Sequence, residues 1–426
     1  MGKQTDVLVI GAGLAGLTAA WQVAMQGKKV KVLAKGWGAT HWHSGCIDLL
    51  GYWPLDADTA VAHPAQAIEQ LIKEQPQHPY ALAGLDNITA ALSAFQELCA
   101  VAGYPLEGSP EKNWLLPTAV GTFRPTCLAP QTMTAGDLSD DAPMLLVGFA
   151  QFVDFYPRLA ADNLTQQGVP AAHVTLDLPS LAQQRRLTSV VLAHMMEQET
   201  FRQEVAQALK PKLGQAARVG FPAVLGLQEA AAVWQAMSDL LERPVFEIPT
   251  LPPSVAGIRL HHILKNAIQA QGGWVFDGME AVGAEKDGGR VTAVLTETAA
   301  RNRAHRAQNY VLSTGGILGG GIYASYKGGV QEVVFDLPVN APDNHLDWFY
   351  TDFMDKRGHP IYQTGISVNE QFQPVNGSEQ PLLSNLFAAG ATLAHCEPVR
   401  ERSFEGIALA TGYVVGSRVV GSRTND

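Results

Sequence analysis

The chain opens with Asp6-Val-Leu-Val-Ile-Gly-Ala-Gly-Leu-Ala-Gly16, an apolar run that leads into three glycines spaced as GxGxxG. A helical pattern follows from Leu14 to about Gln26, and Gly27 is placed to end it. A second apolar segment, Lys29–Ala34, has the length and composition of a buried parallel strand. This order predicts a strand–turn–helix–strand unit of the Rossmann type at the start of an α/β protein.

Each glycine of the turn has an expected role. Gly11 permits a tight turn, Gly13 lets phosphate oxygens reach the backbone, and Gly16 lets the helix pack closely on the strand. The first helical residues, Leu14 and Ala15, present unpaired N–H groups at the positive end of the helix dipole. We therefore predict that Gly11–Gly16 binds a phosphate of a cofactor; the alternative is a packing turn without a ligand.

The second strand lacks the acidic residue that usually binds an adenosine ribose, since the expected place reads Val32-Leu-Ala-Lys35. Two hypotheses follow. The cofactor has no adenosine, as in FMN, or it is FAD with its ribose held by residues elsewhere. Lys35 is a candidate phosphate contact, although a solvated lysine after a strand is the more ordinary interpretation.

Three later segments fit a flavin site. Tyr310-Val-Leu-Ser-Thr-Gly-Gly316 is an apolar strand that ends in a small-residue turn, and Asn385-Leu-Phe-Ala-Ala-Gly390 is a second one. Gly406-Ile-Ala-Leu-Ala-Thr-Gly412 starts a helix whose N-terminus is expected to face the flavin ring and to stabilise its reduced form. Each alone is explained by ordinary packing, but their order along one chain favours a flavin. The residues expected to contact it are Thr314, Gly315, Gly390, Ala391, Thr392, Gly406 and Ile407.

Length and pattern predict two domains. The chain has 426 residues, which exceeds one ordinary core. We expect residues 1–51 and 252–426 to form a discontinuous Rossmann-type flavin-binding domain, and residues 52–251 to form an inserted mixed α/β cap or interaction domain. The segment that returns to the first domain, Thr250-Leu-Pro-Pro-Ser-Val-Ala-Gly-Ile-Arg-Leu260, reads as a stiff loop that runs into a helix, with Ser254 as its cap.

Composition narrows the function classes. With 30 Lys plus Arg and 40 Asp plus Glu, the formal net charge is −10, which disfavours nucleic-acid binding. The four cysteines form no CxxC pair, so neither a zinc site nor an iron–sulfur cluster is expected, and sparse cysteine suits a reducing cytoplasm. The apolar opening is better explained by a buried strand and helix than by a signal peptide or a membrane span.

Candidate catalytic residues lie outside the glycine turn. The oxidation of an alcohol by a flavin needs a base for the hydroxyl proton, and an anionic substrate needs arginines. His43 is a candidate base in the loop after the second strand, where Ser44 and Gly45 are candidate flavin contacts. Arg259 and Arg124 are candidate anion contacts, with a structural ion pair as the alternative for Arg259.

These residues resemble a known family, the B subunits of anaerobic glycerol-3-phosphate dehydrogenase, over essentially the whole chain. The segment Thr250–Leu260 is the most specific part of the resemblance. The other stretches that carry it are Gly11–Gly16, Ser44-Gly-Cys-Ile-Asp-Leu-Leu50, His78-Pro-Tyr80, Gly121-Thr-Phe-Arg124 and Asn385–Gly390. The chain departs from the family pattern at Arg400-Glu-Arg-Ser-Phe-Glu405, where a turn rich in Gly and Cys is typical.

The resemblance implies a flavin subunit, described as using FMN, that acts with a larger catalytic flavoprotein subunit and an iron–sulfur subunit that anchors both to the membrane. It implies oxidation of sn-glycerol 3-phosphate, a small phosphorylated polyol, to dihydroxyacetone phosphate with electrons passed to quinone. The expected location is the cytoplasm, peripheral on the inner face of the membrane. An electron-transfer or assembly subunit without substrate chemistry is the alternative, and an NAD(P)-dependent reductase is disfavoured because no second GxGxxG is present.

Overall fold

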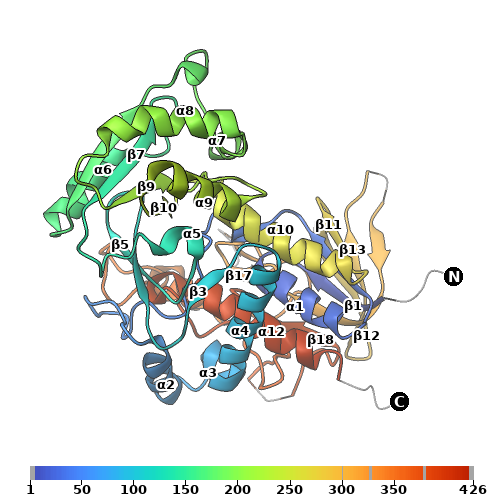
Figure 1. Ribbon diagram of the computed structural model, residues 1–426. Coiled ribbons are helices and arrows are strands. Elements are labelled where there is room, and N and C mark those ends of the chain that lie inside the picture. The colour runs from blue at the N-terminus through green and yellow to red at the C-terminus, as the bar shows by residue number, and fades with distance from the viewer. Residues whose placement is uncertain (1–4, 300, 326–328, 378–379, 422–426) are drawn as a thin grey trace. The chain divides into compact units, whose positions relative to one another are not determined.

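The computed structural model describes residues 5–299, 301–325, 329–377 and 380–421, and the chain divides into two compact units (Figure 1). The first unit comprises Met1–Thr40, Asp48–Ala94 and His261–Asp426, and the second comprises His41–Ile47 and Phe95–Leu260. The predicted domain limits, at residues 51 and 252, differ from this division at residues 41–47, 52–94 and 252–260, and they stay predictions.

The first unit is built on a five-stranded parallel sheet with β1 (Thr5–Ile10) at its centre. The order is β11-β2-β1-β15-β18, and the other strands are β11 (Trp274–Asp277), β2 (Val30–Ala34), β15 (Ala307–Leu312) and β18 (Leu386–Ala388). The carboxyl halves of the central strands, at Val7–Ile10, Val32–Ala34 and Tyr310–Leu312, are apolar and buried, as expected for a sheet with both faces covered. This is a Rossmann-type strand order, so the predicted α/β fold is confirmed.

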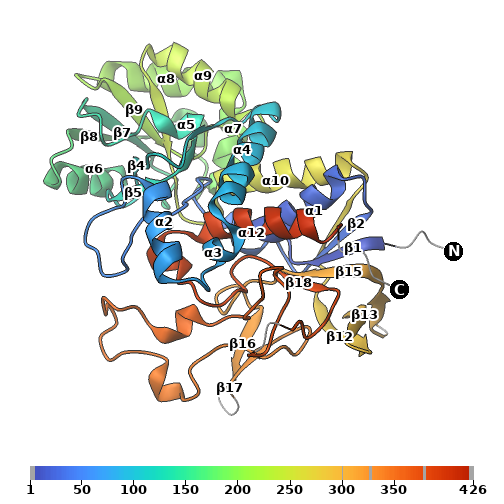
Figure 2. The same ribbon diagram turned by 90° about the horizontal axis from the view of Figure 1, so that it is seen from below.

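Two helices of this unit lie side by side, as Figure 2 shows: α1 (Leu14–Met25) and α12 (Phe404–Arg418). Glycines make the close approach possible. A Cβ atom on Gly412 would lie 2.4 Å from the carbonyl oxygen of Ala15, and one on Gly416 would lie 2.6 Å from that of Ala19. The last helix therefore depends on small residues where it contacts the first.

The remaining elements of the first unit surround this sheet. An antiparallel sheet of β12 (Ala281–Asp287), β13 (Arg290–Thr296) and β14 (Arg303–His305) connects β11 to β15. The other elements are α2 (Pro64–Glu74), α3 (Pro79–Ala83), β16 (Ile322–Ser325), β17 (Gly329–Glu332), η4 (His345–Asp347), η5 (Pro360–Gln363) and α11 (Pro398–Glu401). Two helices, α4 (Leu85–Val101) and α10 (Val255–Ala270), and the short helix η1 (Gly38–His41) include residues of both units.

The second unit has a parallel sheet of its own, with the order β10-β9-β7-β8. Its strands are β7 (Met144–Phe149), β8 (Ala171–Leu176), β9 (Arg218–Pro222) and β10 (Val245–Ile248). Buried Leu146, Phe221 and Phe246 belong to its core. Its helices are α5 (Gln131–Thr134), α6 (Pro157–Gln166), η2 (Pro179–Leu181), α7 (Ser189–Met196), α8 (Glu199–Leu209), η3 (Lys210–Lys212) and α9 (Ala230–Leu241).

Two hairpin-like pairs precede that sheet in the chain, β3 (Leu106–Gly108) with β6 (Leu128–Pro130) and β4 (Trp114–Pro117) with β5 (Phe123–Thr126). The expected helix after the Pro-Pro loop is α10, and Ser254 caps it as predicted, because its Oγ accepts the N–H of Gly257 at 3.0 Å. The predicted mixed α/β fold is confirmed, and residues 189–209 of the second unit form two helices, α7 and α8.

Candidate functional site

The GxGxxG turn lies at the carboxyl edge of the five-stranded sheet, between β1 and α1. Gly11 has φ +112°, and a Cβ atom there would lie 2.2 Å from the carbonyl oxygen of Ser313. A Cβ atom on Gly16 would lie 2.1 Å from the carbonyl oxygen of Gly11, whereas one on Gly13 would meet no atom within 4 Å. Two glycines therefore serve packing and the middle one leaves the backbone open, as expected for a phosphate cradle. The ligand contacts of Gly11, Gly13, Leu14, Ala15 and Gly16 stay predictions.

The turns after β15 and β18 meet each other and α1. A Cβ atom on Gly316 would lie 2.4 Å from the carbonyl oxygen of Ala391, and one on Gly390 would lie 2.6 Å from the Cβ of Ala15. The N–H of Gly390 donates to the Oγ1 of Thr411 in α12 at 2.9 Å. The fold thus brings together three segments that are far apart in the sequence, all at the carboxyl edge where α/β sheets bind ligands.

Three threonine hydroxyls at this edge are buried and make no hydrogen bond within the described residues: those of Thr40, Thr314 and Thr392. Thr314 follows β15 and Thr392 follows β18, and both were predicted cofactor contacts. Thr40 was not among the predicted site residues. It follows Gly38, which approaches the glycine turn so closely that a Cβ atom on Gly38 would lie 3.2 Å from the Cα of Gly13. Buried hydroxyls are normally paired, so these three fit a polar ligand at the edge of the sheet.

Lys35 lies on the surface after β2. Its Nζ is 2.8 Å from a carboxylate oxygen of Glu280, and its side chain is 77% exposed. The pair is a solvated ion pair of low energetic value. In the structure Lys35 pairs with Glu280, and its predicted contact with a phosphate stays a prediction.

Helix α12 begins at Phe404, two residues before the expected start at Gly406. The N–H of Gly406 donates to the carbonyl oxygen of Asp48 at 3.0 Å, and the N–H of Ile407 donates to that of Ser403 at 2.8 Å. Both N–H groups that were expected to face a flavin are therefore used inside the protein. Contacts of Gly406 and Ile407 with the cofactor stay predictions.

The atypical segment before α12 has structural contacts of its own. The Arg400 guanidinium donates to the carbonyl oxygens of Leu55, Asp355 and Lys356 at 2.9, 3.2 and 2.5 Å. Glu401 is buried and accepts the hydroxyl of Ser403 at 2.6 Å. This segment therefore holds neighbouring loops of the first unit in place.

His43 and Arg124, two predicted catalytic residues, lie in the second unit. Burial, together with the charges of Arg124 and the neighbouring His41, lowers the pKa of His43 to about 3. Its Nδ1 accepts the N–H of Gly45 at 3.0 Å, so the proton of the neutral ring is on Nε2, which is buried without a hydrogen bond in the described structure. His43 is thus arranged to donate a hydrogen bond rather than to accept a proton.

The loop that carries His43 packs on the start of α10. A Cβ atom on Gly45, which has φ +85°, would lie 2.5 Å from the Cβ of Ala256, and the N–H of Ser254 donates to the carbonyl oxygen of His41 at 2.8 Å. The Oγ of Ser44 accepts the N–H of Cys46 at 3.1 Å. Flavin contacts of Ser44 and Gly45 stay predictions.

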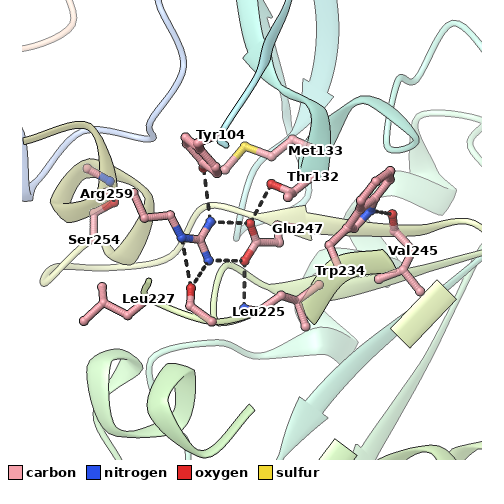
Figure 3. Close-up of polar contacts among 12 residues, drawn as sticks. Tyr104, Thr132, Met133, Leu225, Leu227, Trp234, Val245, Glu247, Ser254 and Arg259 are labelled. Atoms are coloured by element: carbon pink, nitrogen blue, oxygen red, sulfur yellow. Dashed lines mark hydrogen bonds and ion pairs between the residues drawn. The ribbon is translucent and has the colours of Figure 1, made fainter. Parts of the chain in front are cut away.

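Arg259 has the structural role that was its alternative interpretation, as Figure 3 shows. It forms a buried ion pair with Glu247 at 2.7 and 2.9 Å, donates to the hydroxyl of Tyr104 at 3.1 Å, and donates twice to the carbonyl oxygen of Gly226. Burial opposes the charge, but the Glu247 carboxylate outweighs it and holds the pKa of Arg259 above its ordinary value. These bonds use all five N–H groups, so none is left for a substrate anion.

A separate cavity of about 460 Å³ in the first unit lies between β12 and the β16–β17 pair, and its lining includes Lys286, Tyr323 and Glu332. None of the predicted site residues lines it. Among the described residues, no group of three or more His, Cys, Asp or Glu side chains is placed to hold a metal ion, and no helix has the length and apolar character needed to cross a membrane.

Comparison with known proteins identifies relatives along the whole chain. The family model described as FAD binding domain matches residues 6–403. The chain is 34% identical over 428 residues to the probable B subunit of the anaerobic glycerol-3-phosphate dehydrogenase of Halobacterium salinarum, covering 98% of both chains. It is 31% identical over 426 residues to the B subunit of the anaerobic glycerol-3-phosphate dehydrogenase of Yersinia enterocolitica, covering 97% of this chain and 98% of that one.

Among solved structures, 3-ketosteroid delta1-dehydrogenase from Sterolibacterium denitrificans aligns over 98% of this chain and 99% of that one, with a TM-score of 0.45 and 10% sequence identity. A likeness of this degree says nothing about the substrate.

Proposed function

Because the chain belongs to the family of anaerobic glycerol-3-phosphate dehydrogenase B subunits, within the FAD binding domain proteins, we propose that it oxidises sn-glycerol 3-phosphate to dihydroxyacetone phosphate. The match over nearly the whole chain carries this proposal. The phosphate cradle at Gly11–Gly16 and the unpaired hydroxyls at the sheet edge support it. A flavin oxidoreductase is the part that the family itself shows; the substrate and the passage of electrons to quinone are proposed.

The cofactor hypothesis has to be revised. The family description supports a flavin and favours FAD, so the expectation of FMN, which came from Ala34, is not confirmed. We propose that the backbone of Gly11–Gly16 and the hydroxyls of Thr40, Thr314 and Thr392 hold the cofactor; the open backbone at Gly13 and the three hydroxyls without a hydrogen bond support this. When bound, a flavin supplies a two-electron acceptor for the alcohol.

Carboxylates beside Ala34 come from the neighbouring strand. Asp277 of β11 pairs in register with Ala34, and Glu280 follows three residues later. The Nζ of Lys265 is 2.6 Å from Asp277, whereas Glu280 forms an ion pair with Lys35, which is 77% exposed. We propose that Glu280 holds the adenosine ribose in place of the missing acid.

The purified chain should release FAD on denaturation, and Glu280→Gln should bind FAD about 10- to 150-fold more weakly, since a charged hydrogen bond contributes on the order of 1.5–3 kcal/mol. Chromatography of the released flavin and titration of the apoprotein measure both. The control is Glu285→Gln, a similarly exposed acid that faces Arg306 at 3.6 Å. Release of FMN by the wild-type protein would refute the FAD assignment. If Glu280→Gln and Glu285→Gln bound FAD with equal affinity, Glu280 would have no role in binding the ribose.

A second candidate function has an observation in its favour. Both leading catalytic candidates are engaged in the structure, since Arg259 has no donor left and His43 has its Nδ1 occupied and its pKa lowered to about 3. The chain would then be an electron-transfer or assembly subunit whose partner oxidises the substrate. The proposed partners are a larger flavoprotein subunit and an iron–sulfur subunit that holds the complex to the inner face of the membrane.

An exposed apolar segment supports an association with partners. Leu346, Phe353 and Met354 of the first unit are 84%, 85% and 78% exposed. Large apolar side chains gathered on a surface are typical of protein–protein contacts. The relatives are named as subunits, and the proposed complex would cover such a surface.

Anaerobic reduction of the bound flavin separates the two functions. If this chain is catalytic, sn-glycerol 3-phosphate should bleach the flavin absorbance of the purified protein, and glycerol with inorganic phosphate should not. Dithionite is the control that shows a reducible flavin. Bleaching that requires co-purified partner subunits would establish the electron-transfer function instead, and no bleaching even in the complex would refute the substrate.

A further inference from the structure

The loop between β18 and α12 carries a buried carboxyl group that no sequence argument identified. Glu397 is 1% exposed, and neither of its carboxylate oxygens makes a hydrogen bond in the described structure. Glu401, one helical turn further, is equally buried and fully bonded: it accepts the hydroxyl of Ser403, contacts Nε2 of His78 at 3.3 Å and accepts the N–H of Glu397 at 2.8 Å. A buried polar group without a partner needs an explanation, and a catalytic role is one.

The surroundings of Glu397 compensate its carboxyl group only in part. A Cβ atom on Gly358 would lie 2.2 Å from Oε2 of Glu397 and 2.9 Å from Nη1 of Arg400, so the missing side chain makes room for both. The Arg400 guanidinium is close, but it donates to the carbonyl oxygens of Leu55, Asp355 and Lys356. It therefore contributes charge without forming an ion pair with Glu397.

Other unpaired polar groups line the same loop. Thr392, five residues before Glu397, is fully buried. Thr364 is also buried, and it lies two residues before Ile366, which forms a β-bridge with Leu393. Neither hydroxyl has a partner among the described residues. The segment that follows β18 thus holds a buried hydroxyl and a buried carboxyl group without hydrogen bonds among the described residues, and Thr364 of a paired segment adds a second such hydroxyl.

The two acids differ in charge as well as in bonding. Burial raises the pKa of Glu397 to about 7, with Glu401 adding to the effect and Arg400, His359 and Gln363 opposing it. Burial also acts on Glu401, but the His78 imidazole and the Ser403 hydroxyl hold the pKa of that carboxyl below its usual range. Neighbouring acids whose environments separate their pKa values are typical of acid–base sites.

We propose that Glu397 is the general base of the reaction, the group that accepts the hydroxyl proton of the alcohol substrate. This proposal rests on the proposed function. The O–H proton passes to the carboxylate of Glu397, and the carbinol C–H bond gives its hydrogen with both electrons to the bound flavin. The alcohol is thereby oxidised by two electrons to a carbonyl, and the flavin is reduced by two.

Glu397→Gln tests the proposal in the flavin-loaded protein. Flavin reduction by sn-glycerol 3-phosphate should slow by about 10²–10⁴-fold, the usual contribution of a general base, while flavin content and reduction by dithionite are unchanged. The wild-type rate should rise as the pH passes about 7, and this rise should be absent in the variant. Glu397→Asp should restore part of the rate together with the pH dependence. The control is Glu370→Gln, an exposed acid of the same unit, which should behave as wild type.

A second measurement needs no turnover. Since the folded protein raises the pKa of Glu397 above the unfolded value, ionisation of Glu397 destabilises the fold as the pH rises from about 4.5 to about 7. Glu397→Gln should therefore raise the melting temperature at pH 8.5 relative to wild type and lose this advantage at pH 4, with no such trend for Glu370→Gln.

The outcomes separate the two proposals. Reduction that is equally fast in wild type and Glu397→Gln would overturn the role of Glu397 and leave the proposed function standing. No reduction of the wild-type protein, alone or in its complex, would overturn the proposed function. A melting difference that does not change with pH would show that the carboxyl group titrates normally and would also overturn the role of Glu397.

Discussion

Arg259 and Glu397 show, at the scale of single residues, how the environment decides the role of a charged side chain. Arg259 stands in the most specific sequence motif of the chain, yet all its donors are bound internally to Glu247, Tyr104 and Gly226. Glu397 stands in a segment without a motif, yet its buried carboxyl group has no hydrogen bond in the described residues. A specific motif therefore need not mark a substrate contact: at Arg259 the side chain is required for internal hydrogen bonds.

Arg259→Ala should destabilise the protein by about 3–5 kcal/mol, because it leaves the Glu247 carboxylate buried without its partner. Urea or thermal unfolding measures the change. The matched control is Arg158→Ala, which removes an exposed pair with Asp162 and should change stability by less than about 0.5 kcal/mol. A variant that keeps its stability but raises the KM for the substrate would restore Arg259 as an anion contact.

At the scale of elements, small residues of the last helix serve its packing. Gly412 and Gly416 allow α12 to lie against α1, while the predicted approach of Gly406 and Ile407 to the flavin stays a prediction. Because α1 begins at the phosphate turn, the packing of the last helix positions the first. A sequence pattern of small residues does not say which of the two roles it serves.

Gly412→Ala measures this packing. Alanine in a helix normally stabilises by about 1 kcal/mol relative to glycine, but here the new Cβ would lie 2.4 Å from a backbone oxygen of α1, so we expect a net loss of about 1–3 kcal/mol and weaker flavin binding. Thermal melting and flavin titration report both effects. Gly283→Ala in β12, where a Cβ would meet nothing within 4 Å, should leave both unchanged. An increase in the stability of Gly412→Ala would contradict the close approach.

At the scale of the whole molecule, the sequence predicted the order of elements well. The strands β1 and β2 and the helix α1 lie within a few residues of their predicted ranges, and β15 and β18 overlap the predicted segments 310–316 and 385–390. These elements have strong local signals: apolar runs of strand length, helical periodicity and glycine or proline at their ends. The family resemblance added the function, and the comparisons confirm the family.

The amino-acid sequence alone determined the Rossmann-type start, the cap at Ser254 and the family, because glycine spacing, periodicity and caps act between residues close in the chain. Only the tertiary structure decided that Arg259 is bound to a tyrosine 155 residues away, that α12 lies against α1, and that Glu397 is buried without a hydrogen bond among the described residues. The physical reason is that burial and pairing depend on which distant segments meet. No local pattern encodes the dielectric surroundings or the remaining donors of a charged side chain.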